Sequence, residues 1–352
     1  MLPPSNLSRM NITVAANDKP AQNADILEND IMGLSPELLA ALLRDHTTGR
    51  NIFWATHDYE ALGKGYGYHD EITPESITGA NGRIITPRMY KAENVQAERK
   101  RNKAEIFTPS WIVNAQLNLI DEAWFGRKAA FNTEHDDHTW TPVEGRIAFG
   151  GEKGKTWKDY VRDTRLEITC GEAPYLASRY DATTGELIPI EKRVGIIDRK
   201  LRVVGENTET TGDWLKWAQE AFMSTYGYEW QGDSLLLARE SLFYTWLDHF
   251  KAKFGNDAEP QEKSCKSVAY IISWNLWQMD GLKGVVPDSC GDKIDDHNFF
   301  GYVNIVPCEG CRTGDIRKHN GTYCRIRDWH AKCAPGEGPS KKLRFIDLMI
   351  NK

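Results

Sequence analysis

The sequence predicts an α/β protein with a helical and irregular N-terminal region and a small Cys-rich lobe toward its C-terminal end. Three apolar runs each end in a turn that contains glycine or an acidic residue, and each run lies before or near a helical pattern. The chain has 352 residues, of which 40% are apolar, so it is long enough for two domains or for one large α/β domain with additions.

Composition narrows the class of protein. The formal charge of −6 argues against a uniformly basic nucleic-acid-coating protein, although an acidic total can hide a basic face. The sequence contains no run of about 18 apolar residues and no N-terminal secretion signal, which excludes a membrane span of the usual kind. The seven cysteines are an odd number, which suits a reduced compartment better than a disulfide framework. We therefore expect a cytoplasmic protein.

The first 104 residues are predicted to hold a tail and a small α+β region. Residues 1–30 are polar and have no hydrophobic period, as in a mobile tail, and residues 31–104 form the next region. Within it, the run SPELLAALLRD has a serine at the N-cap, a proline at the first helical position and a leucine stripe, which predicts a helix. The runs at 51–59 and 82–90 are predicted to be short strands.

A basic stretch follows at residues 91–105 on a helix-prone background. It carries five cations, namely Lys91, Arg99, Lys100, Arg101 and Lys103. A solvated helix face is the favoured interpretation, and a phosphate-contacting patch is the alternative. An amphipathic helix is predicted next, with Ile112, Leu117, Leu119 and Ile120 available for a core.

The three turns are predicted to form one ligand site. They lie at residues 166–176, 228–233 and 278–282. In an open α/β sheet, ligands bind outside the carboxyl ends of the strands, where small residues let backbone N–H groups approach them. A nucleoside ligand also needs a carboxylate for the ribose hydroxyls and a polar group for the base edge, and Glu229 and Asp280 stand at suitable places. Each residue also has a simpler interpretation, as a strand-end residue for Glu229 and as a turn for Asp280.

Three motifs in this region resemble those of the adenine-N6 DNA methyltransferases that use S-adenosyl-L-methionine. LEITCGEAPYL resembles the cofactor-binding loop of that family, and YGYEWQGDSLLLARESL resembles its second element, Tyr-Gly-x-Glu followed by a helix. IFTPSWI resembles the Phe-Thr-Pro element that precedes the loop in type I modification subunits. The three motifs occur in the order of the family.

The resemblance implies a Rossmann-like methyltransferase domain over residues 105–288, with S-adenosyl-L-methionine as cofactor and DNA as partner. It also implies a restriction-modification or phage-related setting with a possible partner subunit. The implied cofactor-binding residues are Phe107, Thr108, Pro109, Glu167, Cys170, Gly171, Ala173, Glu229 and Asp280.

The sequence departs from the family at two places. Ala173 stands where the loop usually has a second glycine, and an alanine is tolerated there only if its φ is negative. The catalytic tetrapeptide, an Asn, Asp or Ser followed by Pro-Pro and an aromatic residue, is absent. KKLRFIDLMINK resembles the strand that leads to this tetrapeptide. Asn298, followed by Phe299, is a candidate catalytic substitute for it. The alternative interpretation of Asn298 is a loop asparagine beside core phenylalanines.

A metal site is predicted in the lobe at residues 289–352. Cys308 and Cys311 form a Cys-x2-Cys pair, and Cys324 and Cys333 follow at spacings that suit a zinc knuckle. His319 or His330 is an alternative to Cys333 as the fourth ligand, and free cysteines in a turn-rich lobe are the alternative to a metal. The same lobe carries cations suited to phosphates, namely Arg312, Arg317, Lys318, Arg325 and Arg327.

Two other functions compete with methylation. A non-catalytic DNA-binding or specificity component of a restriction or defence system would keep the cofactor fold as a scaffold. A metal-dependent nuclease is suggested by Glu152 and Lys155 in an acid-x-x-Lys arrangement, with Asp136 or Asp137 as the second acid. Cys170 is interpreted as a small buried residue, because no neighbouring His-x-Asp pattern supports a nucleophile.

Overall fold

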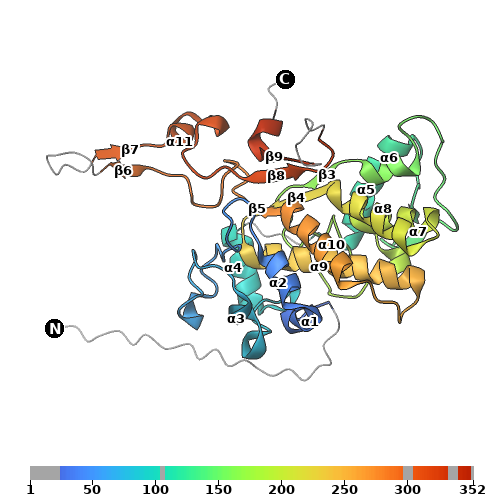
Figure 1. The fold of residues 1–352 in the computed structure, drawn as a ribbon, viewed down its shortest axis with the longest axis horizontal. Coiled ribbons are helices and arrows are strands. Elements are labelled where there is room, and N and C mark those ends of the chain that lie inside the picture. The colour runs from blue at the N-terminus through green and yellow to red at the C-terminus, as the bar shows by residue number, and fades with distance from the viewer. Residues whose placement is uncertain (1–23, 104–107, 296–303, 332–339, 350–352) are drawn as a thin grey trace.

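A computed structural model of the chain describes residues 24–103, 108–295, 304–331 and 340–349 and shows a mixed α/β fold (Figure 1). At its centre lies a parallel sheet of three strands, β3 (Arg165–Glu167), β4 (Thr225–Glu229) and β5 (Leu276–Gln278), in the order β3-β4-β5. Glu167 pairs with Gly227, and Glu229 pairs with Gln278. The three carboxyl ends therefore lie side by side.

Two helix pairs connect these strands. α7 (Ile196–Asn207) and α8 (Thr211–Met223) lie between β3 and β4, and α9 (Gly232–Phe254) and α10 (Glu262–Asn275) lie between β4 and β5. Helices α8, α9 and α10 pack against the sheet, Tyr228 and Trp277 pack against Ile326 and Phe345 of the C-terminal lobe, and all residues of β5 are buried. Trp214 and Trp246 are among the largest fully buried side chains of this core.

The remaining elements surround the sheet. The N-terminal region contains α1 (Glu28–Leu34), α2 (Pro36–Leu43), α3 (Pro74–Ile77) and α4 (Glu93–Lys103), with the 3-10 turns Glu60–Leu62, Gly79–Asn81 and Arg88–Tyr90. Between it and β3 come α5 (Ser110–Phe125), the hairpin β1 (Asn132–Glu134) and β2 (Trp140–Pro142), and α6 (Trp157–Arg162). A further 3-10 turn, Ile190–Lys192, precedes α7.

The C-terminal lobe consists of two antiparallel strand pairs and short helical turns. β6 (Lys293–Asp295) pairs with β7 (Asn304–Val306), and β8 (Arg325–Asp328) pairs with β9 (Lys341–Arg344). Between the pairs lie α11 (Glu309–Thr313) and the 3-10 turn Ile316–Lys318, and the 3-10 turn Phe345–Leu348 follows β9. In Figure 1 the β6-β7 pair projects from the body of the protein at the upper left.

Several predicted elements are confirmed. The leucine-striped helix is α2, and Ser35 occupies its N-cap position, although its hydroxyl donates to the Glu37 carboxylate and makes no side-chain cap bond to the backbone. The amphipathic helix is α5, in which Leu117 is buried but Leu119 is 66% exposed. The packed structure begins inside the range predicted to be a tail, because Ala24 and Ile26 are buried.

Other predictions were wrong. The runs at 51–59 and 82–90 form no strand, and Asn51 and Phe53 make isolated bridges instead. The sequence before Asn207 has no clear period and predicts a loop, but it contains α7. The apolar run at residues 267–282 predicts a strand, but most of it belongs to α10. A short continuous apolar run does not distinguish a buried helix from a buried strand, and only its last residues enter β5.

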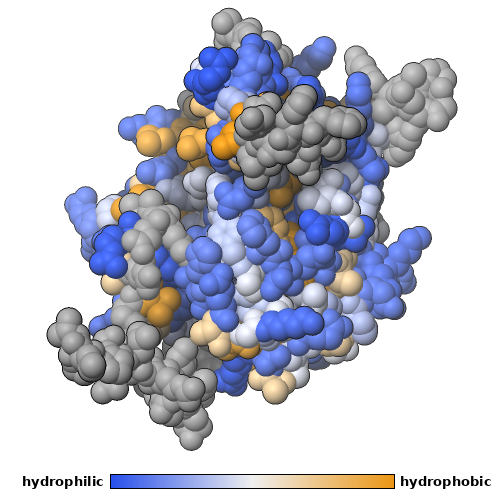
Figure 2. Space-filling view, turned by 90° about the vertical axis from the view of Figure 1, so that its left-hand side faces the viewer, coloured by the Kyte–Doolittle hydropathy of each residue, from blue (hydrophilic) through white to orange (hydrophobic). Residues whose placement is uncertain are grey.

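The described residues contain one parallel sheet, of three strands, and this small sheet does not confirm the Rossmann-like methyltransferase sheet expected from the resemblance. The strand KKLR, compared above with the approach to the catalytic tetrapeptide, is β9, and it pairs with β8 in a separate antiparallel ladder. The face drawn in Figure 2 is covered mainly by hydrophilic residues, with apolar residues in small patches. None of the described helices is long and apolar enough to span a membrane.

Candidate functional site

The loop after β3 adopts an unusual backbone conformation. Thr169, Gly171 and Ala173 all have positive φ values, of 47°, 55° and 60°. The N–H of Cys170 donates to the carbonyl of Tyr228 on the neighbouring strand (2.9 Å), and the N–H of Ala173 donates to the Cys170 carbonyl (2.7 Å). The sequence led us to expect a negative φ at Ala173, and that expectation was wrong. The left-handed conformation costs a non-glycine residue roughly 1–2 kcal/mol. The methyl group is completely buried, and its packing compensates for this strain.

Glu229 joins this loop to the end of β4. Its carboxylate accepts hydrogen bonds from the backbone N–H groups of Gly171 (2.8 Å), Trp230 (2.8 Å) and Gln231 (3.2 Å). The residue is 8% exposed. Bonds from N–H groups to a carboxylate are among the stronger hydrogen bonds in proteins. Glu229 therefore holds the turn at 166–176 and the turn at 228–233 in one arrangement.

A cavity of about 1020 Å³ lies over these strand ends. Glu167, Glu229 and the backbone of 168–171 form one side of it, and helix α5 contributes Leu117 and Ile120. Leu166 and Ile168 are 43% and 63% exposed and also face it, because β3 is the edge strand of the sheet. The combination of apolar walls with a few convergent polar groups is typical of a small-molecule site.

Glu167 gives the cavity an unusual carboxyl group. Its Oε2 atom is enclosed and has no hydrogen-bond partner among the described residues. Burial raises the pKa of the Glu167 carboxyl well above its usual range, against the N–H groups of Tyr175 and Leu176, which lower it, and the charge of Glu229 raises it further. The protonated form of the Glu167 carboxyl, which can donate a hydrogen bond, is therefore favoured more than is usual for a glutamate.

Cys170 is 2% exposed and lies beneath the same loop. Burial, followed by the charges of Glu167 and Glu229, raises the pKa of its thiol well above the usual range. A thiol that stays neutral is a poor nucleophile, so Cys170 acts here as the small buried residue that the sequence favoured.

The other implied cofactor residues have different positions. Thr108 lines the cavity, Pro109 lines a second cavity of about 470 Å³ beside α5, and Ala173 lies in the core. Phe107 lies outside the described residues.

Asp280 is close to the third strand end but turned away from the cavity. Its carboxylate accepts the N–H groups of Leu282 (2.9 Å) and Lys283 (3.2 Å), and it is not among the residues that line the cavity. Asp280 therefore caps its own turn, which is the simpler of the two interpretations considered from the sequence.

The N-terminal region supplies a wall that sequence reasoning missed. His57, Asp58 and Tyr68 line the cavity, and the Tyr68 hydroxyl accepts a hydrogen bond from the indole of Trp230 (3.0 Å). These residues precede β4 by more than 150 positions, and no local motif connects them to it. A contact of this kind could be found only from the fold.

A buried ion-pair network fixes that wall. Asp233 on α9 is completely buried and pairs with Arg99 (3.0 Å) and Lys91 (3.0 Å), and Arg99 also pairs with Asp58 at the cavity (2.5 Å). Although burial raises it, these cations hold the pKa of Asp233 well below its usual range. Lys91 and Arg99 thus belong neither to a solvated face nor to a phosphate patch.

A second site lies in the C-terminal lobe, where four side chains converge on one point. Cys290, Cys308, Cys311 and His319 place their ligand atoms within 4.8 Å of one another. Cys290 Sγ lies 3.2 Å from Cys308 Sγ, 3.6 Å from Cys311 Sγ and 3.2 Å from His319 Nδ1. A tetrahedron with metal–sulfur bonds of 2.3 Å has sulfur–sulfur edges of roughly 3.8 Å, so this group can hold a metal ion.

The surroundings of the group orient its ligands. A Cβ atom at Gly310 would lie 2.6 Å from His319 Nδ1, so only glycine lets the imidazole approach. The N–H of Cys308 donates to Asp292 (3.1 Å). Burial raises the pKa of the Cys308 thiol, but backbone N–H groups of Cys311 and Asn320 outweigh it and lower that pKa to about 6. A thiolate is the form that binds metals.

The predicted ligand set is corrected in part. Cys308 and Cys311 belong to the group, and His319 was a predicted alternative. Cys324 does not belong to the group, because it is completely buried and its thiol contacts the carbonyl of Gln278 (3.3 Å). Cys290 takes its place, and was missed because it lies 18 residues before Cys308, outside any Cys-x2-Cys pattern. Cys333 lies outside the described residues.

Two remaining hypotheses gain little from the structure. Asn298 and Phe299, the candidate catalytic pair, lie outside the described residues. The nuclease hypothesis needs converging carboxylates, but Lys155 donates to the carbonyl of Trp124, and the described residues contain no metal-ligating group other than the Cys3His group.

Comparisons of the chain with protein-family models, with curated proteins and with solved structures found no match.

Proposed function

We propose that this protein binds S-adenosyl-L-methionine in the cavity over β3 and β4 and acts in DNA adenine modification, alone or with a partner subunit. The observation that carries the proposal is the hydrogen bond from Gly171 to Glu229. It joins the glycine loop and the acidic strand end at one cavity, and these are the two elements that the sequence resemblance assigns to the adenosyl cofactor.

The chemistry of the cavity suits such a ligand. Glu229 offers its carboxyl group at the end of β4, where the hydroxyls of a ribose can donate to it. The carboxyl of Glu167 and residues 168–171 offer polar groups for the amino-acid part, and Leu117, Ile120 and Leu166 are apolar surface for the base. A volume of about 1020 Å³ accommodates a nucleoside with an amino-acid arm.

Calorimetric titration with S-adenosyl-L-methionine tests the cofactor site. Wild type should bind it, and Glu229→Gln should weaken binding at least tenfold, because hydrogen bonds to a charged group contribute about 1.5–3 kcal/mol each. Asp280→Asn is the matched control, since this carboxylate caps a turn outside the cavity and its loss should leave the affinity unchanged. Thermal unfolding of both variants separates lost binding from lost folding. No heat with wild type, or equal affinity in Glu229→Gln, contradicts the proposal.

Transfer of a tritiated methyl group to DNA then distinguishes an enzyme from a scaffold. In the reaction, a flipped adenine amine attacks the sulfonium methyl group, the carbon–sulfur bond breaks, S-adenosylhomocysteine leaves and the amine loses a proton to solvent. Cofactor binding without transfer favours the alternative, a non-catalytic DNA-binding or specificity component. That alternative draws on the absence of the catalytic tetrapeptide from the sequence.

We further propose that the Cys3His group binds zinc with a structural role. Three thiolates and one imidazole around a closed point suit Zn²⁺, and all four coordination positions are supplied by the protein. Elemental analysis of purified protein should give one zinc per chain. Folded protein without metal contradicts this assignment.

A further inference from the structure

The β8-β9 ladder places cations directly opposite cations. Arg325 faces Arg344, and Arg327 faces Lys342, while Ile326 and Leu343 alternate with them and pack into the small core of the lobe. Residues paired across antiparallel strands project their side chains from the same face, so these four cations share the face away from Ile326. We call this set, Arg325, Arg327, Lys342 and Arg344, the cation ladder.

Such pairing is unfavourable within the protein itself. Like charges directly opposite each other destabilise a strand pair, and strands usually place opposite charges there. The carboxylates beside the ladder lie toward its two ends, where Asp328 faces Lys341 and Asp347 pairs with Arg344 (2.8 Å). No carboxylate lies opposite Arg325, Arg327 or Lys342 in the register of the strands.

Aromatic rings hold three of these cations in place, and the guanidinium of Arg344 lies 5.3 Å from the ring of Tyr323. The guanidinium of Arg327 lies over the rings of Trp329 (4.6 Å) and Tyr270 (5.6 Å), and its Nη1 donates to the Tyr270 hydroxyl (2.6 Å). The ammonium of Lys342 lies 5.1 Å from the ring of Trp274. Rings orient a cation without neutralising it, so the positive charge remains available.

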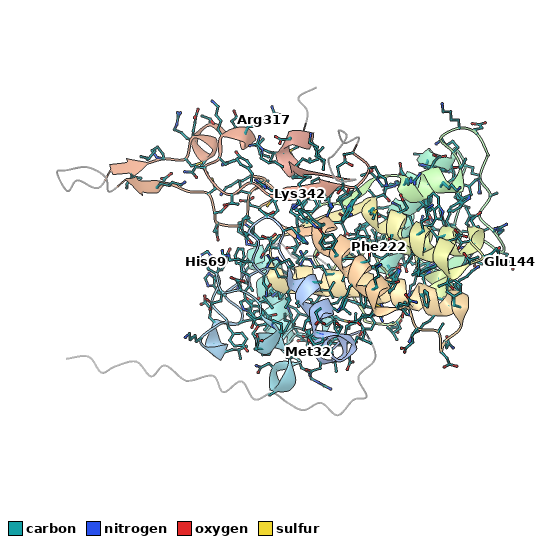
Figure 3. All side chains as sticks on the ribbon, in the orientation of Figure 1. Met32, His69, Glu144, Phe222, Arg317 and Lys342 are labelled. Atoms are coloured by element: carbon teal, nitrogen blue, oxygen red, sulfur yellow. The ribbon has the colours of Figure 1, made fainter. Side chains whose placement is uncertain are left out.

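A histidine lies beside the ladder. His46 stacks on Trp274 with ring centroids 4.0 Å apart. Burial, and then Arg239, Arg44, Lys342 and Arg327, lower the pKa of His46 to about 3. The imidazole is therefore neutral and adds no charge of its own, while Tyr270 remains 41% exposed. Lys342 is labelled in Figure 3, in the upper half of the view.

We propose that the cation ladder is a binding surface for the phosphate backbone of DNA. Cations two residues apart on a strand lie roughly 6.8 Å apart, which spans about two phosphates along one DNA strand. Three of the four cations are exposed, and three have no carboxylate opposite them in the strand register; such cations interleaved with rings are the features expected of a phosphate-binding surface. The Arg325 end also lies beside the carboxyl end of β5, because Cys324 contacts the Gln278 carbonyl, so bound DNA extends toward the end of the sheet that carries the cavity.

This inference rests on the proposed DNA-directed function and identifies the surface that serves it. Because it depends on charge alone, it makes a prediction about folding as well as binding. Arg325→Glu places a carboxylate opposite Arg344, and Lys342→Glu places one opposite Arg327, so both substitutions replace repulsion by attraction within the ladder. If the ladder had only a structural role, these substitutions would stabilise the protein and leave its DNA affinity unchanged.

Fluorescence anisotropy with a labelled duplex DNA at several salt concentrations tests the surface. The double variant Arg325→Glu/Lys342→Glu should bind at least about tenfold more weakly than wild type, and the slope of log K against log salt should fall by about 2. Its midpoint of thermal unfolding should equal or exceed that of wild type. The control is Lys216→Glu on α8, an exposed cation outside the ladder, which should keep the wild-type affinity.

The outcomes separate this inference from the proposed function. Unchanged DNA affinity of the double variant, an equal loss in Lys216→Glu, or tighter binding to vesicles with anionic lipid than to DNA overturns the inference. S-adenosyl-L-methionine titration is run on the same samples. If DNA binds through the ladder but the protein does not bind the cofactor, the proposed cofactor is overturned and the ladder is supported. If the cofactor binds and DNA binding does not depend on the ladder, the cofactor is supported and the ladder is overturned.

Discussion

The cavity region and the C-terminal lobe both contain irregular loops, but hydrogen bonds to a carboxylate fix the loops of the first, and a cluster of cysteine and histidine side chains joins those of the second. In the cavity region, Glu229 collects three backbone N–H groups above a sheet whose crossover helices are packed with tryptophan and leucine. In the lobe, three cysteines and a histidine from separate turns meet at one point beside a small core. There the strand residues Ile305 and Val306 are 59% and 46% exposed.

This difference indicates how an irregular loop is stabilised when much or little apolar surface is buried beneath it. Where helices and the β8-β9 lobe together cover a sheet, a buried carboxylate can organise the turns, because the fold itself excludes water. Where a segment is too small to bury its own side chains, coordination by a metal supplies the missing free energy. The following experiments test that contrast, starting from the largest expected effect.

Removal of the metal should unfold the lobe and leave the cavity region folded. In Cys308→Ser, the group loses a ligand, so we expect loss of bound metal and loss of hydrogen-exchange protection in residues 290–295 and 304–320. Structural zinc contributes several kcal/mol to folding in small domains, which makes this the largest effect. Cys324→Ser is the matched control, because this thiol is buried outside the group. Equal metal content in Cys308→Ser and wild type would falsify the assignment.

Loss of the buried carboxylate of Asp233 should destabilise the cavity region but not the lobe. Asp233→Asn leaves Arg99 and Lys91 near an uncharged partner in a buried site, which costs about 3–5 kcal/mol when one member of a buried pair is removed. Urea unfolding followed by tryptophan fluorescence measures this loss, and metal content should stay unchanged. A difference below about 1 kcal/mol would show that the network does not support the wall.

A group of buried acids should make the N-terminal region less stable as the pH rises. Burial raises the pKa of Asp25 to about 7 and that of Glu28 to about 8, and both oxygens of the buried Glu240 lack a hydrogen-bond partner among the described residues. These acids therefore bind more protons in the folded state than in the unfolded state above pH 4.5, which makes their contribution to stability fall as the pH rises. The free energy of unfolding should fall between about pH 4.5 and 8.

Glu240→Gln tests this pH dependence. Burial raises the pKa of Glu240 well above its usual range, and the charges of Glu28 and Asp25 raise it further. The amide should flatten the pH profile and stabilise the protein at pH 8 by about 1–3 kcal/mol, with no gain at pH 5. Urea unfolding at both pH values measures the effect. A parallel shift of the whole profile would contradict the explanation by titration.

Some of the site could be predicted from local sequence alone. The loop at 166–176 and Glu229 were identified because small residues and an acid follow apolar runs, and the parallel sheet does bring them to one cavity. Asp280 has the same local pattern, but the direction of its side chain depends on the turn that it caps. Sequence spacing places a residue at a strand end without fixing where its carboxylate points.

The sequence by itself determined the α/β pattern, the helix α2, the strand β4 and the Cys308-x2-Cys311 pair, because each depends on residues within about one turn of one another. The tertiary structure decided which distant residues meet: His57 and Tyr68 at the cavity, Cys290 and His319 at the metal group, and Arg325 opposite Arg344. Those contacts join segments separated by long stretches of chain. Their partners are selected by packing and strand register, which no local pattern encodes.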